Sequence, residues 1–493
     1  MKYSDKTIKL IQSLTSSEKR YFILSVKKDE KKQYIKLYKV IEKKIKRTNF
    51  EIKPKDLKEI KNISFNKKYL YNTILKNLRN YKANSSVKLN LLNVLLDIKF
   101  LKTKGLTNEV ILLINRGKKI ARKHELHLLL LQLLNEEREL VLRMEKTLAE
   151  KIKILKTNTA QTQKITQSFL RGNHIGNLYS RTVLANNFVY NRPEAKRELT
   201  SIIQDKELYV NNSELNTLSN IQTGEILSIY NFKVREDYAR ASLIYGESLT
   251  LQIKNIHLLL NNFLGIYPGI YNYCLLCIKA KKYDEVEKYI YAKPFKYLHF
   301  KNPSPFTQCC ILILIKTLEI QLHIEKKEYG DLVVIEAEIK KLLKIYVLHN
   351  ECKEVNELYF FMAIFCFKAG KLGKALIYSE KLLNSTHTEY KLLSLLFNLI
   401  IYYESGQQEL LNKTYKLTSN YIDENDSKIL AEYNLFIDLV AKKMTSNYPK
   451  KKIDEELEIL KQKLIDTQQV DDFFIDWIGS KIKKTDFWEP FQN

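Results

Sequence analysis

Apolar residues recur every three or four positions along most of the chain, and short polar breaks separate the segments that carry this pattern. Such spacing predicts amphipathic α-helices, each with one buried stripe. The pattern is clearest from Asn356 to Glu389, where two apolar segments flank a break at Gly370. Because glycine has no Cβ, Gly370 can adopt the left-handed conformation that ends a helix. This stretch is therefore predicted to be a helical hairpin.

The same turn-plus-helix pattern recurs along the chain, clearly at residues 236–241, 281–286, 327–332 and 370–375. Its third residue serves as an anchor, and fainter segments extend the series in both directions. The anchors are Thr107, Leu148, Pro193, Tyr238, Tyr283, Tyr329, Leu372 and Gln408, with spacings of 41, 45, 45, 45, 46, 43 and 36 residues. A recurrence of this kind predicts stacked helix pairs that form one continuous curved rod.

The residues at the best-defined turn resemble those of a tetratricopeptide repeat. The aromatic, small, turn and second-helix positions of that motif fall on Tyr359, Ala363, Gly370 and Ala375, whereas His387 stands where the family has a closing proline. The resemblance is clearest over residues 236–389, and it implies an all-α fold, a right-handed α-solenoid of TPR-like helix pairs. The units are longer than the roughly 34 residues typical of that family.

The same resemblance implies a function as a non-catalytic scaffold or adaptor that binds a protein or peptide segment on a concave helical surface. In the best-matched unit, Glu357, Phe360, Ile364 and Phe367 would line that surface. Three of the four are apolar, so the expected ligand is an apolar helix or segment. Alternatively, the chain itself covers these side chains and they belong to the core.

Residues 1–85 are predicted to be a separate basic helical module. Thr15 and Glu18 fit a capping box at the start of one helix, Pro54 suits the first turn of a short helix, and Asn66 opens a longer helix to about Tyr81. This order of helices loosely resembles a helix-turn-helix arrangement. The repeat array is predicted over residues 86–425, and C-terminal helices over residues 426–493 are predicted to cap it.

The chain has a formal net charge of +26, and the excess is concentrated near its start. Residues 1–85 hold 24 Lys and Arg against 8 Asp and Glu, a net charge of +16. The alternative function is therefore that of a nucleic-acid-associated regulator whose N-terminal module contacts DNA or RNA phosphates. The residues that would do so are Lys67, Lys68, Lys76, Arg79 and Lys82. The competing interpretation is a solvated lysine face without base-reading groups.

No arrangement of residues proposes an enzyme, a cofactor site or a metal site. Cys274 and Cys277, with His299 and the adjacent Cys309 and Cys310 downstream, could suggest zinc. Their apolar neighbours favour burial as small core residues instead. Phosphate-binding glycine loops and the common hydrolase motifs do not occur in the sequence.

Two further segments attract attention because of their aromatic residues. The segment from Pro294 to Pro305 is expected to be an ordered loop, since its aromatic side chains would be costly to leave in water. The segment from Val470 to Asn493 is either a terminal cap of the array or an exposed docking peptide, and the cap is favoured. No signal peptide or membrane span is predicted, so a cytoplasmic location with reduced thiols is expected.

Overall fold

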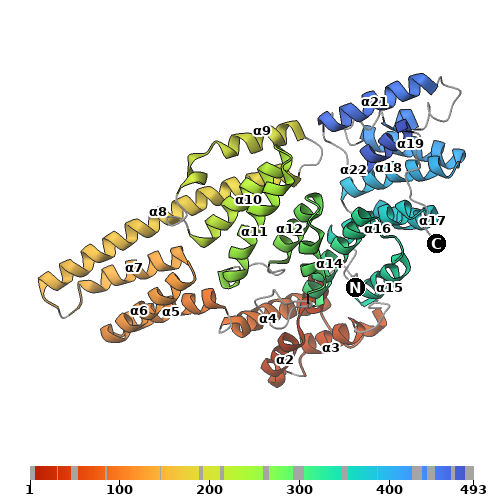
Figure 1. Ribbon diagram of the computed structural model, residues 1–493. Helices are drawn as coiled ribbons and strands as arrows, with labels where there is room; N and C mark the ends of the chain where they lie inside the picture. Colours follow the sequence, from red (N-terminus) through yellow and green to blue (C-terminus); the bar gives the residue numbers. More distant parts are fainter. Residues whose placement is uncertain are drawn as a thin grey trace. The chain divides into compact units, whose positions relative to one another are not determined.

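The computed structural model describes residues 6–29, 31–45, 54–83, 86–144, 146–187, 192–210, 216–258, 266–292, 305–345, 353–385, 387–424, 436–440, 450–467 and 472–483. Within these residues every regular element is a helix, and no strand occurs (Figure 1). The predicted all-α class is confirmed. The described residues divide into two compact units: residues 1–172 with 300–306, and residues 173–299 with 307–493.

The first unit begins with four helices that enclose a hydrophobic core of their own. They are α1 (Lys6–Ser13), α2 (Ser16–Ser25), α3 (Gln33–Ile45) and α4 (Ile63–Ala83), with 3-10 turns at Lys27–Asp29 and Pro54–Leu57. The Phe22 and Tyr38 rings lie 4.9 Å apart at the centre of this core, and both side chains are buried. The predicted capping box is present, because Glu18 N donates to Thr15 Oγ1 and Thr15 N donates to the Glu18 carboxylate.

Three further helices and the start of a fourth complete the first unit. They are α5 (Val87–Thr103), α6 (Thr107–Lys123), α7 (His127–Val141) and the N-terminal part of α8 (Leu148–Asn187). Their leucine-rich stripes form a second hydrophobic core. The anchors Leu148 and Pro193 predict a helix pair between them, but α8 is one continuous helix of 40 residues. Neither glycine nor proline interrupts the chain between Leu148 and Arg171, so nothing in this part ends the helix.

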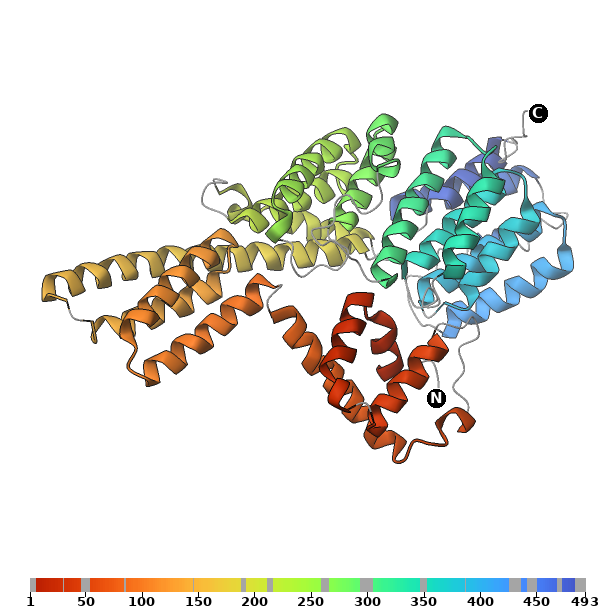
Figure 2. The ribbon, with the colours of Figure 1, turned by 90° about the horizontal axis from the view of Figure 1, so that it is seen from below.

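The second unit contains the C-terminal part of α8 and most of the predicted hairpins. Its other helices are α9 (Arg192–Ile203), α10 (Thr217–Lys233), α11 (Tyr238–Lys254), α12 (Tyr267–Lys279), α13 (Tyr283–Ile290), α14 (Pro305–Lys326), α15 (Leu332–Ile345), α16 (Lys353–Lys368), α17 (Leu372–Leu383), α18 (Thr388–Glu404), α19 (Gln408–Glu424), α21 (Lys450–Thr467) and α22 (Asp472–Lys483). Consecutive helices pack side by side, as α10 with α11 and α16 with α17 show (Figure 2).

One turn geometry joins many of these helices. At Gly370 the backbone φ is 69°, Lys371 N donates to Cys366 O over 2.9 Å, and Gly370 N donates to Phe367 O over 2.9 Å. This pair of bonds is the Schellman motif, which satisfies carbonyls at a helix C-terminus. The same two bonds and a positive φ recur at five other turns, at Gly105, Glu125, Lys281, Lys327 and Gly406. The sequence therefore repeats a backbone conformation, even where the turn residue is not glycine.

The predicted anchors lie at helix starts. Six of them are the first residues of α6, α8, α11, α13, α17 and α19. The other two, Pro193 and Tyr329, lie within three residues of the starts of α9 and α15.

Small residues permit the close crossings that the hairpins need: a Cβ added to Gly224 on α10 would lie 1.9 Å from Ser248 Oγ on α11. Ala363 and Ala375, at the small and second-helix positions of the repeat motif, are both fully buried.

Helix α22 covers apolar side chains of α16 and α18. The Phe473 ring lies 5.5 Å from the Phe367 ring and 5.0 Å from the Phe397 ring. Phe473, Phe474 and Trp477 are all buried, as the cap interpretation expects. Phe487, Trp488 and Phe491 of the same predicted segment lie outside the described residues, as does most of the predicted loop from Pro294 to Pro305.

A carboxylate on α15 joins the hairpin α14–α15 to α17. Glu336 accepts hydrogen bonds from Lys374 Nζ (2.5 Å), Lys340 Nζ (2.9 Å) and the Tyr378 hydroxyl (3.2 Å), and only 11% of its side chain is exposed. Burial by itself would raise the pKa of Glu336. The hydrogen bonds and charges of the two lysines outweigh burial and lower this pKa to about 2.

The hydrogen bonds and ion pairs of Glu336, hereafter the Glu336 clamp, predict that the stability of the second unit falls in acid. Because the Glu336 pKa is lower in the folded than in the unfolded state, its stabilisation is present above about pH 4.5 and is lost as the pH falls towards 2. A shift of this size corresponds to roughly 3 kcal/mol at most. In thermal unfolding across a pH series, Glu336→Gln should lack the loss of stability that the wild type shows between about pH 4.5 and pH 2. Glu338→Gln, a half-exposed control on the same helix, should keep it. Identical pH profiles for wild type and Glu336→Gln would contradict the clamp.

Candidate partner-binding groove

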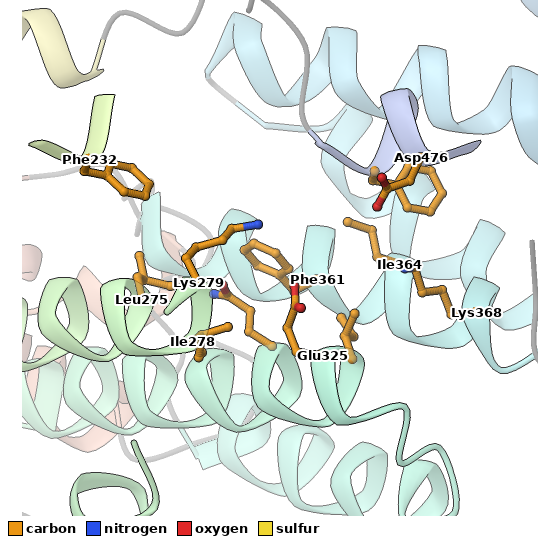
Figure 3. A pocket seen from close by; sticks show the side chains of 12 residues that line it. Phe232, Leu275, Ile278, Lys279, Glu325, Phe361, Ile364, Lys368 and Asp476 are labelled. Carbon is orange, nitrogen blue, oxygen red and sulfur yellow. The ribbon is translucent and has the colours of Figure 1, made fainter. Parts of the chain in front are cut away.

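The second unit contains a groove of about 210 Å³ between helices α10, α12, α14, α16 and α22. Three helices contribute three residues each: Leu275, Ile278 and Lys279; Gln321, Ile324 and Glu325; and Phe361, Ile364 and Lys368. Phe232 of α10, together with Phe473 and Asp476 of α22, completes the lining. Figure 3 shows these side chains around one space, with Phe232 towards one end and Asp476 towards the other.

The lining residues occupy equivalent positions in three successive hairpins. Leu275, Gln321 and Ile364 each lie six residues before a left-handed turn residue, and Lys279, Glu325 and Lys368 each lie two residues before it. Each helix that lines the groove in this way is the first helix of its hairpin. The groove therefore follows from the repeat itself, because equivalent positions of stacked hairpins face the same side.

Charged groups of both signs stand among the apolar side chains of the groove. In helix order, the groove has Lys279, Glu325, Lys368 and Asp476, so that positive and negative groups follow one another. Lys279, Glu325 and Asp476 are exposed, and Lys368 is half-buried. A segment with apolar anchors and charges of both signs would match this surface better than a purely acidic or basic one.

A buried hydrogen-bond network holds the groove helices together. The Tyr271 hydroxyl of α12 donates to Glu357 Oε1 of α16 over 2.6 Å, and Gln321 Nε2 of α14 donates to Tyr271 Oη over 3.0 Å. Burial, together with the nearby Glu357 carboxylate, raises the pKa of Tyr271 well above its ordinary value. The tyrosine therefore stays protonated as a donor, and the network fixes α12, α14 and α16 relative to one another.

The structure places the four predicted partner-binding residues differently from the expectation. Phe360 and Phe367 are 4% and 0% exposed, and Phe367 packs against Phe397 and Phe473. Glu357 is engaged by Tyr271, and of the four only Ile364 lines the groove. The burial of Phe360 and Phe367 favours the alternative that the chain itself covers these side chains, since Phe397 of α18 and Phe473 of α22 contact Phe367.

The groove side of α16 is the neighbouring stripe, Phe361, Ile364 and Lys368. This stripe shares Ile364 with the predicted one but has Phe361 and Lys368 in place of Phe360 and Phe367, so its centre lies about 50° further round the helix. Counting back from each turn residue would have found Lys279, Glu325 and Lys368 in the sequence. Phe232 and the α22 residues carry no such signal, because they reach the groove through tertiary packing alone.

Helix α4 carries the five residues predicted to contact nucleic acid. Lys68, Lys76 and Arg79 are exposed, Lys67 is half-buried, and the Lys82 side chain lies outside the described residues. The exposed side of α4 also carries Asn72 and Asn80, so amide groups are present beside the lysines.

The four cysteines that could suggest zinc are core residues of the second unit. Cys274, Cys277, Cys309 and Cys310 are at most 2% exposed, and burial raises the pKa of the Cys274 and Cys277 thiols. In the part of the chain that the structure describes, no three His, Cys, Asp or Glu residues cluster as metal ligands, and His299 lies outside that part. Thiols held protonated by burial are poor nucleophiles and poor metal ligands.

Comparisons with known proteins add no family to these observations. A scan against protein-family models finds no match, and searches of the curated proteins and of the solved structures find none. Among the described helices, one segment, Phe306–Lys326, is long and apolar enough to cross a membrane, and 61% of an 18-residue window within it is buried inside the protein. Core helices of soluble proteins meet the same criterion, so this helix is weak evidence for a membrane span.

Proposed function

We propose that this chain is a non-catalytic scaffold that binds a segment of a partner protein in the groove between α10, α12, α14, α16 and α22. In this proposal the hairpins form a right-handed, TPR-like α-solenoid in the cytoplasm, and the groove is part of its concave face. The observation that carries the proposal is the repetition of lining positions, six and two residues before three successive turns.

The size and lining of the groove indicate the kind of segment. A volume of about 210 Å³ is below the roughly 300–1,000 Å³ of typical small-molecule sites. It suits one or two apolar anchor side chains of a longer helix or extended segment, seated against Leu275, Ile324 and Phe361. The alternating charges would set the orientation of that segment, because reversing it would place like charges opposite one another.

The test is a comparison of partners captured by matched variants. Phe361→Asp puts a carboxylate among the apolar lining, and Lys279→Glu with Lys368→Glu reverses two charges of the groove. Ile377→Asp on α17 is the control, because Ile377 is 56% exposed and does not line the groove. Each groove variant should bind a partner captured by the wild type with an affinity that is lower by tenfold or more. The control variant should bind this partner with the wild-type affinity.

Circular dichroism and thermal unfolding should be measured on all variants. The charge-reversal variant changes one exposed and one half-buried side chain, so it should fold as the wild type does. If folded groove variants and the wild type capture the same partners with equal affinity, the groove is not the binding site. A partner lost from Ile377→Asp as well would equally contradict the assignment.

A further inference from the structure

Nearly all of the net charge of the chain belongs to the first unit. Residues 1–172 hold 41 Lys and Arg against 16 Asp and Glu, a net charge of +25. Residues 173–493 hold 41 against 40, a net charge of +1. A preference for lysine shared by the whole chain would not produce this division. A strongly basic unit, in a chain whose other unit is nearly neutral, indicates a polyanionic partner of the basic unit.

Helix α4 presents the most specific surface within this unit. Its 21 residues include no Asp or Glu. Its exposed side forms one stripe, hereafter the α4 stripe: Ser64, Phe65, Lys68, Tyr69, Asn72, Lys76, Arg79 and Asn80. These positions recur every three to four residues, so they share one helix face. At 1.5 Å per residue the stripe is about 24 Å long.

Two aromatic rings stand at the beginning of the α4 stripe. Phe65 is 67% exposed and Tyr69 is 44% exposed, and their rings stack at a centroid distance of 6.2 Å and an interplanar angle of 22°. The buried Tyr34 ring of α3 meets the Tyr69 ring edge-on at 4.8 Å. The core thus holds one ring of the pair in place, while the pair itself stays open to solvent.

We propose that the α4 stripe binds single-stranded nucleic acid, with bases stacked on Phe65 and Tyr69 and phosphates beside Lys68, Lys76 and Arg79. Aromatic rings next to a cationic track are the usual means of holding unpaired bases and their backbone. A duplex would offer its phosphates but no free base faces, so it would leave the two rings unused. This proposal does not depend on the groove of the second unit.

A membrane surface fits the α4 stripe less well. An interfacial helix needs a continuous apolar face to bury among the lipid headgroups. The stripe is apolar only at Phe65 and Tyr69, and its remaining five long side chains are amides or cations. Asn72 and Asn80 would have to leave water on insertion, whereas they can donate to and accept from base edges.

The test uses the full-length protein and fluorescence anisotropy with labelled 15-nucleotide single strands of RNA and DNA, in a salt series. Phe65→Ala with Tyr69→Ala should weaken binding by about five- to a hundredfold per stacked base. Lys68→Gln, Lys76→Gln and Arg79→Gln together should reduce the salt slope by about 2, since each phosphate contact contributes roughly 0.7. The groove variant Phe361→Asp should bind the strand with the wild-type affinity. This result would show that strand binding by the α4 stripe does not depend on the groove of the second unit.

Matched controls come from the second unit. Tyr291→Ala removes an aromatic ring that is 67% exposed, and Lys413→Gln with Lys416→Gln removes two exposed lysines of α19. These changes should leave strand binding unaltered. Absence of binding at low salt would overturn the proposal, as would binding that survives removal of both rings. Equal or tighter binding to duplex DNA, to anionic phosphatidylserine vesicles or to polyglutamate would overturn it as well.

Discussion

Replacement of Trp477 by alanine is expected to lower the free energy of unfolding of the second unit by about 3–5 kcal/mol. Trp477 is fully buried, and its ring meets Tyr403 at 5.8 Å and Phe436 at 6.1 Å. Its Nε1 donates to Glu404 Oε1 over 2.6 Å, and Lys481 Nζ lies 2.5 Å from the same oxygen. Alanine would leave a cavity and would also remove one donor from a carboxylate that is only 7% exposed.

Trp477→Phe separates the two contributions. Phenylalanine keeps most of the apolar contact but lacks the indole N–H, so a loss of about 1–2 kcal/mol is expected. Denaturant unfolding monitored by hydrogen exchange would show whether the loss of unfolding free energy belongs to residues 173–493. Ile459→Ala on α21 is the control, because Ile459 is 56% exposed, and it should change stability by less than about 0.5 kcal/mol. A Trp477→Ala protein as stable as this control would contradict the role of α22 as a cap.

Replacement of Phe22 by alanine is expected to destabilise the N-terminal helices by about 3–5 kcal/mol. Phe22 is 2% exposed and packs on Tyr38 in the core formed by α1 to α4. A small helical core has little stability to spare, so the variant should expose most of these helices to exchange. The second unit should keep the exchange protection of the wild type, because its core shares no residue with this one.

Two neighbours on the same helix provide the controls. Leu24→Ala and Ile23→Ala alter side chains that are 61% and 36% exposed, so each should cost less than about 1 kcal/mol. Simultaneous loss of protection in both units would show that they unfold together. Unchanged protection of α1 to α4 in Phe22→Ala would show that this core does not stabilise them. Either result contradicts the expectation of a separately folded N-terminal core.

Local patterns predicted local structure well. The Thr15–Glu18 capping box and the turn at Gly370 depend on residues that are close in sequence, and both form as expected. The left-handed turn residues Lys281 and Lys327 open two of the predicted turn-plus-helix segments, although neither is a glycine, whereas no predicted anchor marks the turn at Glu125. An interval of about 45 residues identifies helix starts because each hairpin contains nearly the same number of residues.

The candidate groove was predicted only in part. Its position on the first helix of each hairpin follows from the repeat, and Ile364 was among the expected residues. The predicted and observed stripes of α16 share Ile364 and differ at the neighbouring residues, because Phe360 and Phe361 are both aromatic and the sequence does not say which one faces the groove. Phe367, expected to be open, is covered by Phe473, which lies more than a hundred residues further along the chain.

The sequence by itself therefore determined the helical class, the hairpin turns and the approximate ends of the helices. These features depend on backbone conformation and on apolar spacing within about twenty residues. Only the tertiary structure decided that α22 covers Phe367, that Tyr271 ties Glu357 to the groove helices, and that the Phe65–Tyr69 pair stays exposed. Each of these outcomes depends on contacts between distant segments, and a hydrophobic side chain has no pattern that distinguishes a covered face from an open one.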